Sequence, residues 1–184
     1  MKGFRRVAPP LRFAAPCDRP AFLPQSRKRQ GAKAAGLRYE ALVASSLGPS
    51  ALHGQWFRFI DADGEAWCQP DFIMYDAEHG CHFVLEAKLS WVPEAAPKLR
   101  SLYLPVVEKA LGAPVLPIVV CRNIEGAPAG QTVLTLFAAK SHALSGACPV
   151  LLWLGPKAGQ LVPHKRQFRP RGANSRLTSV ARAR

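Results

Sequence analysis

The chain has 184 residues, of which 48% are hydrophobic and 20% are charged, and its formal net charge is +13. This length and composition suit a single globular domain and exclude a disordered or collagen-like protein. The apolar runs are much shorter than a bilayer span, which excludes an integral membrane protein, and prolines interrupt the region where a secretion signal would lie. We therefore expect a cytoplasmic protein, encoded by a bacterium or a phage.

Positive charge is concentrated at the two ends of the chain. Residues 1–38 contain ten Lys or Arg and one acid, and residues 157–184 contain eight Lys or Arg and no acid, whereas residues 39–156 carry a net charge of −4. Basic ends suit a polyanion such as DNA, although they can also serve only to keep a protein soluble. The pattern predicts three parts: a basic, proline-rich N-terminal arm at 1–29, a folded domain at 30–160 and a basic C-terminal arm at 161–184. The side chains expected to contact nucleic acid are Arg27, Lys28, Arg29, Lys33, Lys165, Arg166, Arg169 and Arg171.

The folded domain is predicted to begin with a helix and three strands. Residues 30–47 are rich in alanine, carry apolar side chains at helical spacing and end at a Gly-Pro pair, which indicates a helix. Residues 56–61 form an aromatic strand that an Asp-Gly turn connects to a second strand at 66–75. Pro70 inside that second strand requires an edge position or a bulge. Residues 81–89 are predicted as a third strand, apolar enough to lie at the centre of a sheet.

A second helix and further strands are predicted after residue 90. The helix spans about 94–111, with a kink or a restart at Pro105, and a buried strand follows at 115–121. Less regular patterns predict strands at 132–138 and 150–154 on either side of a short helix at 139–144. The resulting order favours an α/β (α+β) fold, in which a mixed central sheet is flanked by helices on both faces.

Four ionisable residues interrupt apolar segments: Glu40 in the first helix, Asp71 in the second strand, and Glu86 and Lys88 in the third. Strand alternation places Glu86 and Lys88 on one face, about 6.6 Å apart along the strand. Charged groups near a core cost desolvation free energy unless something compensates them, and a divalent cation bound by Asp71 and Glu86 would do so. Carboxylate oxygens suit Mg²⁺, with Mn²⁺ as an alternative.

Two acids and a lysine in this arrangement are the groups that phosphodiester hydrolysis requires. The carboxylates hold the metal, the metal lowers the pKa of a bound water, and a nearby cation stabilises negative charge in the transition state. The structural alternative is that Glu86 and Lys88 form an exposed ion pair at a strand end.

Gln69-Pro70-Asp71 followed by Glu86-Ala87-Lys88 resembles the PD-(D/E)XK signature of the restriction-endonuclease-like nuclease superfamily. The resemblance covers about residues 30–121 and implies an αβββαβ core. It implies that Asp71 and Glu86 are metal ligands, that Lys88 orients or activates the attacking water, and that Glu40 is an outer metal contact. It also implies DNA as substrate, and a homodimer as one way in which a small enzyme cuts two strands.

One departure from that family bears on the type of nuclease. Its exonuclease branch often has a Gln four residues before a Tyr in the helix after the motif, and here Leu99 precedes Tyr103. We therefore expect a metal-dependent DNA nuclease of the endonuclease or junction-resolving type. The alternative is a noncatalytic nucleic-acid-binding protein that retains the fold.

Weaker candidates belong to other classes of site. The five cysteines are widely spaced and indicate reduced thiols, but a zinc site is an alternative for Cys68, His79, Cys81 and His82. Asp61, Asp63 and Glu65 flank a glycine but lack the remaining ligands of a calcium loop, so a solvated turn is expected. Trp56, Phe57 and Phe59 beside Arg58 could stack on bases, although aromatic strand residues usually fill a core.

Overall fold

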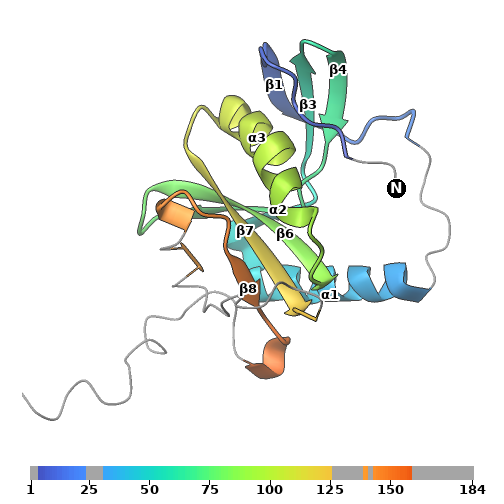
Figure 1. The fold of residues 1–184 in the computed structure, drawn as a ribbon, viewed down its shortest axis with the longest axis vertical. Helices are drawn as coiled ribbons and strands as arrows, with labels where there is room; N and C mark the ends of the chain where they lie inside the picture. Colours follow the sequence, from blue (N-terminus) through green and yellow to red (C-terminus); the bar gives the residue numbers. More distant parts are fainter. Residues whose placement is uncertain (1–3, 24–30, 126–138, 141–142, 159–184) are drawn as a thin grey trace, which may run out of the picture.

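The computed structural model describes residues 4–23, 31–125, 139–140 and 143–158 (Figure 1). Within these residues the strands form two sheets, a central sheet in the order β2-β5-β6-β7-β8 and a small sheet in the order β1-β3-β4. The strands are β1 (Phe13–Cys17), β2 (Ala51–His53), β3 (Trp56–Asp61), β4 (Gly64–Cys68), β5 (Phe72–Asp76), β6 (Cys81–Ser90), β7 (Val115–Asn123) and β8 (Val150–Leu152).

Helices cover both faces of the central sheet (Figure 1). The first, α1 (Gly31–Leu47), packs on one face, and η1 (Gly48–Ser50) follows it. On the other face lie α2 (Ala95–Lys98), a π-helical stretch η2 (Leu99–Tyr103) and α3 (Leu104–Leu111), and η3 (Pro156–Ala158) lies after β8. Pro105 lies in the first turn of α3, where its missing N–H costs nothing, and Gly112 ends that helix in the left-handed conformation with φ 63°. The predicted mixed α+β architecture is therefore confirmed.

The central sheet is mixed, and its direction changes at β6. Strands β2, β5 and β6 are antiparallel neighbours, whereas β6, β7 and β8 run parallel. The carboxyl ends of the three parallel strands therefore meet at one end of the sheet. Along β6, Phe83, Leu85 and Ala87 pack on the α1 side, and Val84 packs on the α2–α3 side. Because strand residues alternate between faces, Glu86 and Lys88 lie on the α2–α3 side with Val84.

The prediction of one continuous strand over residues 66–75 is wrong. The chain leaves the small sheet after β4 and enters the central sheet at β5, with Gln69, Pro70 and Asp71 between them. Proline has no N–H to donate to a ladder, so the pairing that holds β4 to β3 cannot continue through Pro70. The hairpin β3–β4 consequently belongs to the small sheet, and the first strand of the central sheet is β2, which is too short to give a sequence signal.

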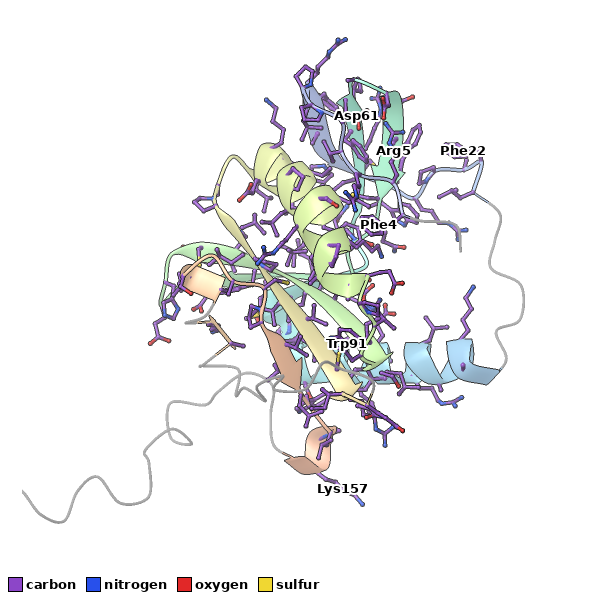
Figure 2. All side chains as sticks on the ribbon, in the orientation of Figure 1. Phe4, Arg5, Phe22, Asp61, Trp91 and Lys157 are labelled. Carbon is purple, nitrogen blue, oxygen red and sulfur yellow. The ribbon has the colours of Figure 1, made fainter. Side chains whose placement is uncertain are left out.

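Residues 1–29 are predicted as an arm outside the folded domain, and the structure differs for residues 4–23. Strand β1 pairs with β3 from Phe13↔Ile60 to Cys17↔Trp56. The side chain of Arg5 donates to Asp61 Oδ1 over 2.6 Å, and Figure 2 shows these two residues together beside the small sheet. The strand has a proline and no alternating pattern, but a proline is tolerated on an edge strand, and β1 is the edge of the small sheet.

Several other predicted elements are found close to their expected bounds. The helix at 30–47, the strand at 56–61 and the strand at 81–89 correspond to α1, β3 and β6. The strand predicted at 132–138 lies outside the described residues, and those residues of 139–144 that are described have helical backbone. In the described part of the chain, every helix falls short of the length and apolar character that a bilayer crossing requires.

Candidate active site

Asp71 and Glu86 are brought together by the antiparallel pairing of β5 with β6. Phe72 pairs with Leu85, so Asp71, one residue before β5, lies opposite Glu86. Side chains at such opposed positions have Cβ atoms about 5 Å apart. Two backbone contacts fix Asp71: its Oδ2 accepts from the N–H of Ala87 over 2.8 Å, and its carbonyl accepts from the N–H of Gly54 over 2.9 Å. The two predicted metal ligands therefore lie side by side.

Glu86 is fully buried, and two lysines bind the same one of its oxygens. Its Oε1 accepts from Lys88 Nζ over 2.5 Å and from Lys98 Nζ over 3.0 Å. Among the described residues no group hydrogen-bonds to the other oxygen, Oε2, which is also buried. Buried carboxylate oxygens normally have a partner, because leaving one unpaired costs free energy. In Glu86, Oε1 is thus bound by two lysines, and Oε2 is available to a ligand.

The electrostatics of the site raise the pKa of two groups. Burial, followed by the negative charge of Glu86, raises the pKa of Asp71 from 3.8 to about 7, against the lowering effect of Lys88 and with a further contribution from Glu40. Burial alone would lower the pKa of Lys88, but Glu86 and Asp71 outweigh that effect and raise it. The Nζ of Lys88 lies 3.9 Å from Asp71 Oδ2. The neighbouring acids therefore favour the protonated form of Asp71 and the charged form of Lys88.

Glu40 approaches the same site from the other face of the sheet. Its Oε1 lies 2.8 Å from His53 Nε2, and the His53 ring stacks on Phe72 with centroids 4.8 Å apart. The contact with β2 holds Glu40 near the end of the sheet, close enough for its charge to raise the pKa of Asp71. This position suits an outer contact and differs from the direct adjacency of Asp71 and Glu86.

The residues present fit a hard divalent cation. Asp71 and Glu86 provide carboxylate oxygens from neighbouring strands, and the unpartnered Oε2 of Glu86 is a ligand atom without a competing donor among the described residues. A cation between these acids would relieve the repulsion that raises the pKa of Asp71. With Lys88 beside them, the arrangement can bind a metal and hold an anionic oxygen next to it.

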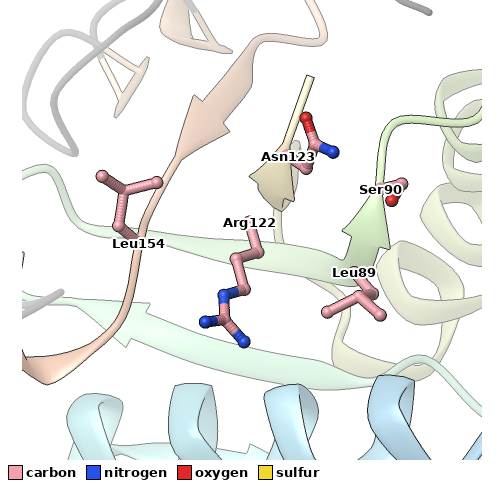
Figure 3. Close-up of a pocket in the computed structure, with 5 residues that line it drawn as sticks. All are labelled: Leu89, Ser90, Arg122, Asn123 and Leu154. Carbon is pink, nitrogen blue, oxygen red and sulfur yellow. The ribbon is translucent and has the colours of Figure 1, made fainter. Parts of the chain in front are cut away.

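A cleft of about 380 Å³ opens at the same end of the sheet, on the α1 side. The end of β6 contributes Leu89 and Ser90 to its lining, the end of β7 contributes Arg122 and Asn123, and the segment after β8 contributes Leu154. Figure 3 shows the Arg122 side chain extending from β7 toward α1 between Leu89 and Leu154. Neither Asp71 nor Glu86 is among the residues that line this cleft.

Most of the predicted nucleic-acid contacts lie outside the described residues: Arg27, Lys28, Arg29, Lys165, Arg166, Arg169 and Arg171. Lys33, in the first turn of α1, is exposed. The prediction that these side chains bind DNA remains a prediction.

The zinc alternative does not have the geometry it requires. Cys68 belongs to β4 in the small sheet and packs with the α2–α3 cluster, whereas Cys81 packs with the α1 cluster on the opposite face of the central sheet. His79 Nδ1 lies 2.9 Å from Asp76 Oδ2, and the His82 ring lies 5.0 Å from the Tyr75 ring in a tilted arrangement. His82 is the second residue of β6 and lies four strand positions before Glu86, so it is remote from the acids.

Two other acidic groups have structural partners. Asp61 is buried and accepts from Arg5, from the N–H of Ala8 and from the N–H of Asp63, so it anchors the N-terminal segment and does not form a calcium site. Asp76, Glu78 and His79 place ligand atoms within 4.8 Å of one another, but Lys140 Nζ lies 2.6 Å from Asp76 Oδ2. Lys140 thus already neutralises the Asp76 carboxylate in that group.

Lys98 and His53 are the members of the site that the sequence analysis missed. Lys98 is one of several lysines in basic or amphipathic stretches, and only the contact between α2 and β6 brings it to Glu86. His53 lies in a three-residue strand without a sequence signature. Of the aromatic candidates, Phe57 and Phe59 fill the core, as expected for strand residues.

Comparisons of the chain with protein-family models, with curated proteins and with solved structures find no match.

Proposed function

We propose that this chain is a metal-dependent DNA nuclease of the PD-(D/E)XK type, hydrolysing phosphodiester bonds with Mg²⁺ or Mn²⁺. The observation that carries the proposal is the adjacency of Asp71 to a fully buried Glu86 whose Oε2 is unpartnered among the described residues, with Lys88 bound to both acids. If the ion pair of Glu86 with Lys88 served only stability, it would not need Asp71 beside it, because burial and the charge of Glu86 make Asp71 costly to ionise.

The order of the elements supports the same proposal. Helix α1, strands β2, β5 and β6, the helical segment α2–α3 and strand β7 follow one another as α-β-β-β-α-β, with β7 parallel to β6. The hairpin β3–β4 is then an insertion between the first two strands of such a core, paired with β1 in its own sheet. The restriction-endonuclease-like superfamily has this order, although the three strands differ from those expected from the sequence.

The proposed mechanism assigns each side chain one task. Asp71 and Glu86 would hold a divalent cation, which would lower the pKa of a bound water and offset the charge of phosphate oxygens. Lys88 orients the attacking water and stabilises the charge that builds on the phosphate. Glu40, which His53 holds in place, adds negative charge near the metal site and contacts the metal only through water.

An endonuclease or junction-resolving activity fits the helix after β6 better than an exonuclease activity does. Leu99, at the position where the exonuclease branch often has Gln, is fully buried in the hydrophobic core and has no polar group to offer to a phosphate or a metal. A second copy of the chain would provide the second site needed to cut both strands.

The test is cleavage of plasmid, linear duplex, branched and single-stranded DNA with Mg²⁺ or with EDTA. We expect metal-dependent cutting of at least one substrate and its loss in Lys88→Ala, with Lys109→Ala, an exposed lysine of α3, as the matched control. If no substrate is cut with metal but all bind tightly at low salt, the chain is a noncatalytic nucleic-acid-binding protein. That result would overturn the proposal.

A further inference from the structure

Lys98 contacts the site from the helical segment that covers it. It is the last residue of α2, its side chain is 28% exposed, and its Nζ lies 3.0 Å from Glu86 Oε1. The same Nζ lies 4.6 Å from the centre of the Tyr103 ring, which gives the ammonium a second favourable contact. Lys98 is thus held between a buried acid and an aromatic face, with part of its side chain open to solvent.

The π-helical stretch explains why Lys98 and Tyr103 meet. In η2 the N–H of Leu104 donates to the carbonyl of Leu99, five residues earlier, so this turn is wider than an α-helical one. Residues five apart then lie closer to one face than they do in an α-helix, which brings the Tyr103 ring under the Lys98 ammonium. Such wide turns are frequent at functional sites, because they redirect side chains without breaking the helix.

The charges around Glu86 limit how a metal can enter. Lys88 and Lys98 already place two positive charges on one carboxylate oxygen, and a divalent cation at Oε2 would face both of them across that carboxylate. A divalent cation and two ammonium groups on opposite oxygens of one buried carboxylate repel one another. A phosphate diester brings the negative charge that offsets this repulsion, and a flexible, partly exposed lysine can move to it.

We propose that Lys98 is a second phosphate-binding residue of this site, which neutralises Glu86 in the free protein and transfers to the phosphate diester when metal and DNA bind together. This inference rests on the proposed function. It makes metal and DNA binding mutually dependent: each improves the affinity of the other, and Lys98 carries part of that coupling. Lys88, which bonds to Glu86 and also lies near Asp71, stays with the acids.

The experiment measures Ca²⁺ affinity by calorimetry, alone and with a short DNA duplex whose integrity is checked on a gel. Lys98→Met keeps the length and apolar body of the side chain and removes the charge. We expect it to bind Ca²⁺ alone about fivefold more tightly than the wild type, and to lose at least about fivefold of the increase in Ca²⁺ affinity that DNA produces in the wild type. Lys98→Arg should keep most of that increase, and Lys109→Met should match the wild type.

The outcomes separate this inference from the proposed function. If the wild type cuts DNA and binds Ca²⁺, but Lys98→Met shows the same affinity alone and the same increase with DNA, Lys98 only pins the helix to β6 and the inference is wrong. Weaker binding of Ca²⁺ alone by a folded Lys98→Met, checked by circular dichroism, would also overturn it. If the wild type neither cuts DNA nor binds a divalent cation, the proposed function fails, and the inference fails with it.

Discussion

Asp71→Asn should stabilise the metal-free protein at alkaline pH. The folded chain raises the pKa of Asp71 from 3.8 to about 7, first because the group is buried and then because Glu86 lies beside it. A raised pKa means that the folded state holds the proton more tightly than the unfolded state does. Stability is therefore greatest below the unfolded pKa of 3.8 and falls as the pH rises through about 7.

The size of the effect follows from that difference. At about 1.36 kcal/mol for each pKa unit, the change from 3.8 to about 7 corresponds to about 4 kcal/mol at most. Because 18% of the Asp71 side chain is exposed, solvent reduces the cost of ionisation, and we expect about 2 kcal/mol. Asparagine removes the charge and keeps an oxygen that can accept from the N–H of Ala87.

Urea unfolding in EDTA, followed by tryptophan fluorescence, measures this prediction. Asp71→Asn should be more stable than the wild type at about pH 8 and equal to it at about pH 4. The matched control is Asp76→Asn. Burial raises the pKa of Asp76, but hydrogen bonds from Lys140 and His79 outweigh that effect and lower it. Removing this charge should therefore destabilise the protein at about pH 8. Destabilisation by Asp71→Asn at about pH 8, or a gain in stability that is the same at both pH values, would show that ionised Asp71 does not destabilise the folded protein.

Further predictions address the lysine, the N-terminal segment and the arms. Lys88→Ala should leave metal affinity nearly intact and still lose cleavage rate, because its charge acts mainly as negative charge builds on the phosphate; single-turnover kinetics and calorimetry separate the two. Asp61→Ala should cost about 2–4 kcal/mol in urea unfolding, since it leaves the donors of Arg5, Ala8 and Asp63 without their acceptor in a buried place. Removing residues 165–184 should weaken DNA binding and flatten its salt dependence, measured by fluorescence anisotropy, without changing the rate at saturating DNA. Neutralising four basic side chains near the N-terminus should have the same effect on binding: Arg27, Lys28, Arg29 and Lys33.

The N-terminal arm cannot be tested by simple deletion. Removing residues 1–29 would also remove β1 from the small sheet and the Arg5–Asp61 ion pair. A loss of DNA binding in that truncated chain would then report unfolding as well as lost charge. Charge-neutralising substitutions outside β1 avoid this difficulty.

The parts of the fold that local sequence patterns determine were predicted correctly. Helix α1 ends at the expected Gly-Pro pair, β3 has its predicted bounds, and β6 combines an apolar run with the polar pair Glu86 and Lys88. The predicted neighbours Asp71 and Glu86 do meet, because the pairing of β5 with β6 is set by a short turn.

The parts that depend on tertiary contacts were not predicted. Strand β1 contains Pro16 and exists because β3 offers an edge to pair with, and β2 has only three residues. The division of residues 66–75 between two sheets follows from the missing N–H of Pro70, which the sequence analysis recognised only as a bulge or an edge. Lys98 was missed because its direction depends on the packing of α2 on β6 and on the π turn that follows it.

Single-turnover cleavage of the preferred DNA substrate by the wild type and by Glu86→Gln, at saturating protein and Mg²⁺, tests whether Glu86 binds the metal that cleavage requires. The substitution keeps the shape of the side chain and removes the charge that binds the metal at Oε2. We expect cleavage to fall by orders of magnitude while DNA affinity in EDTA stays the same or rises, because a negative charge facing the phosphates is gone. Cleavage by a folded Glu86→Gln at the wild-type rate would contradict this expectation.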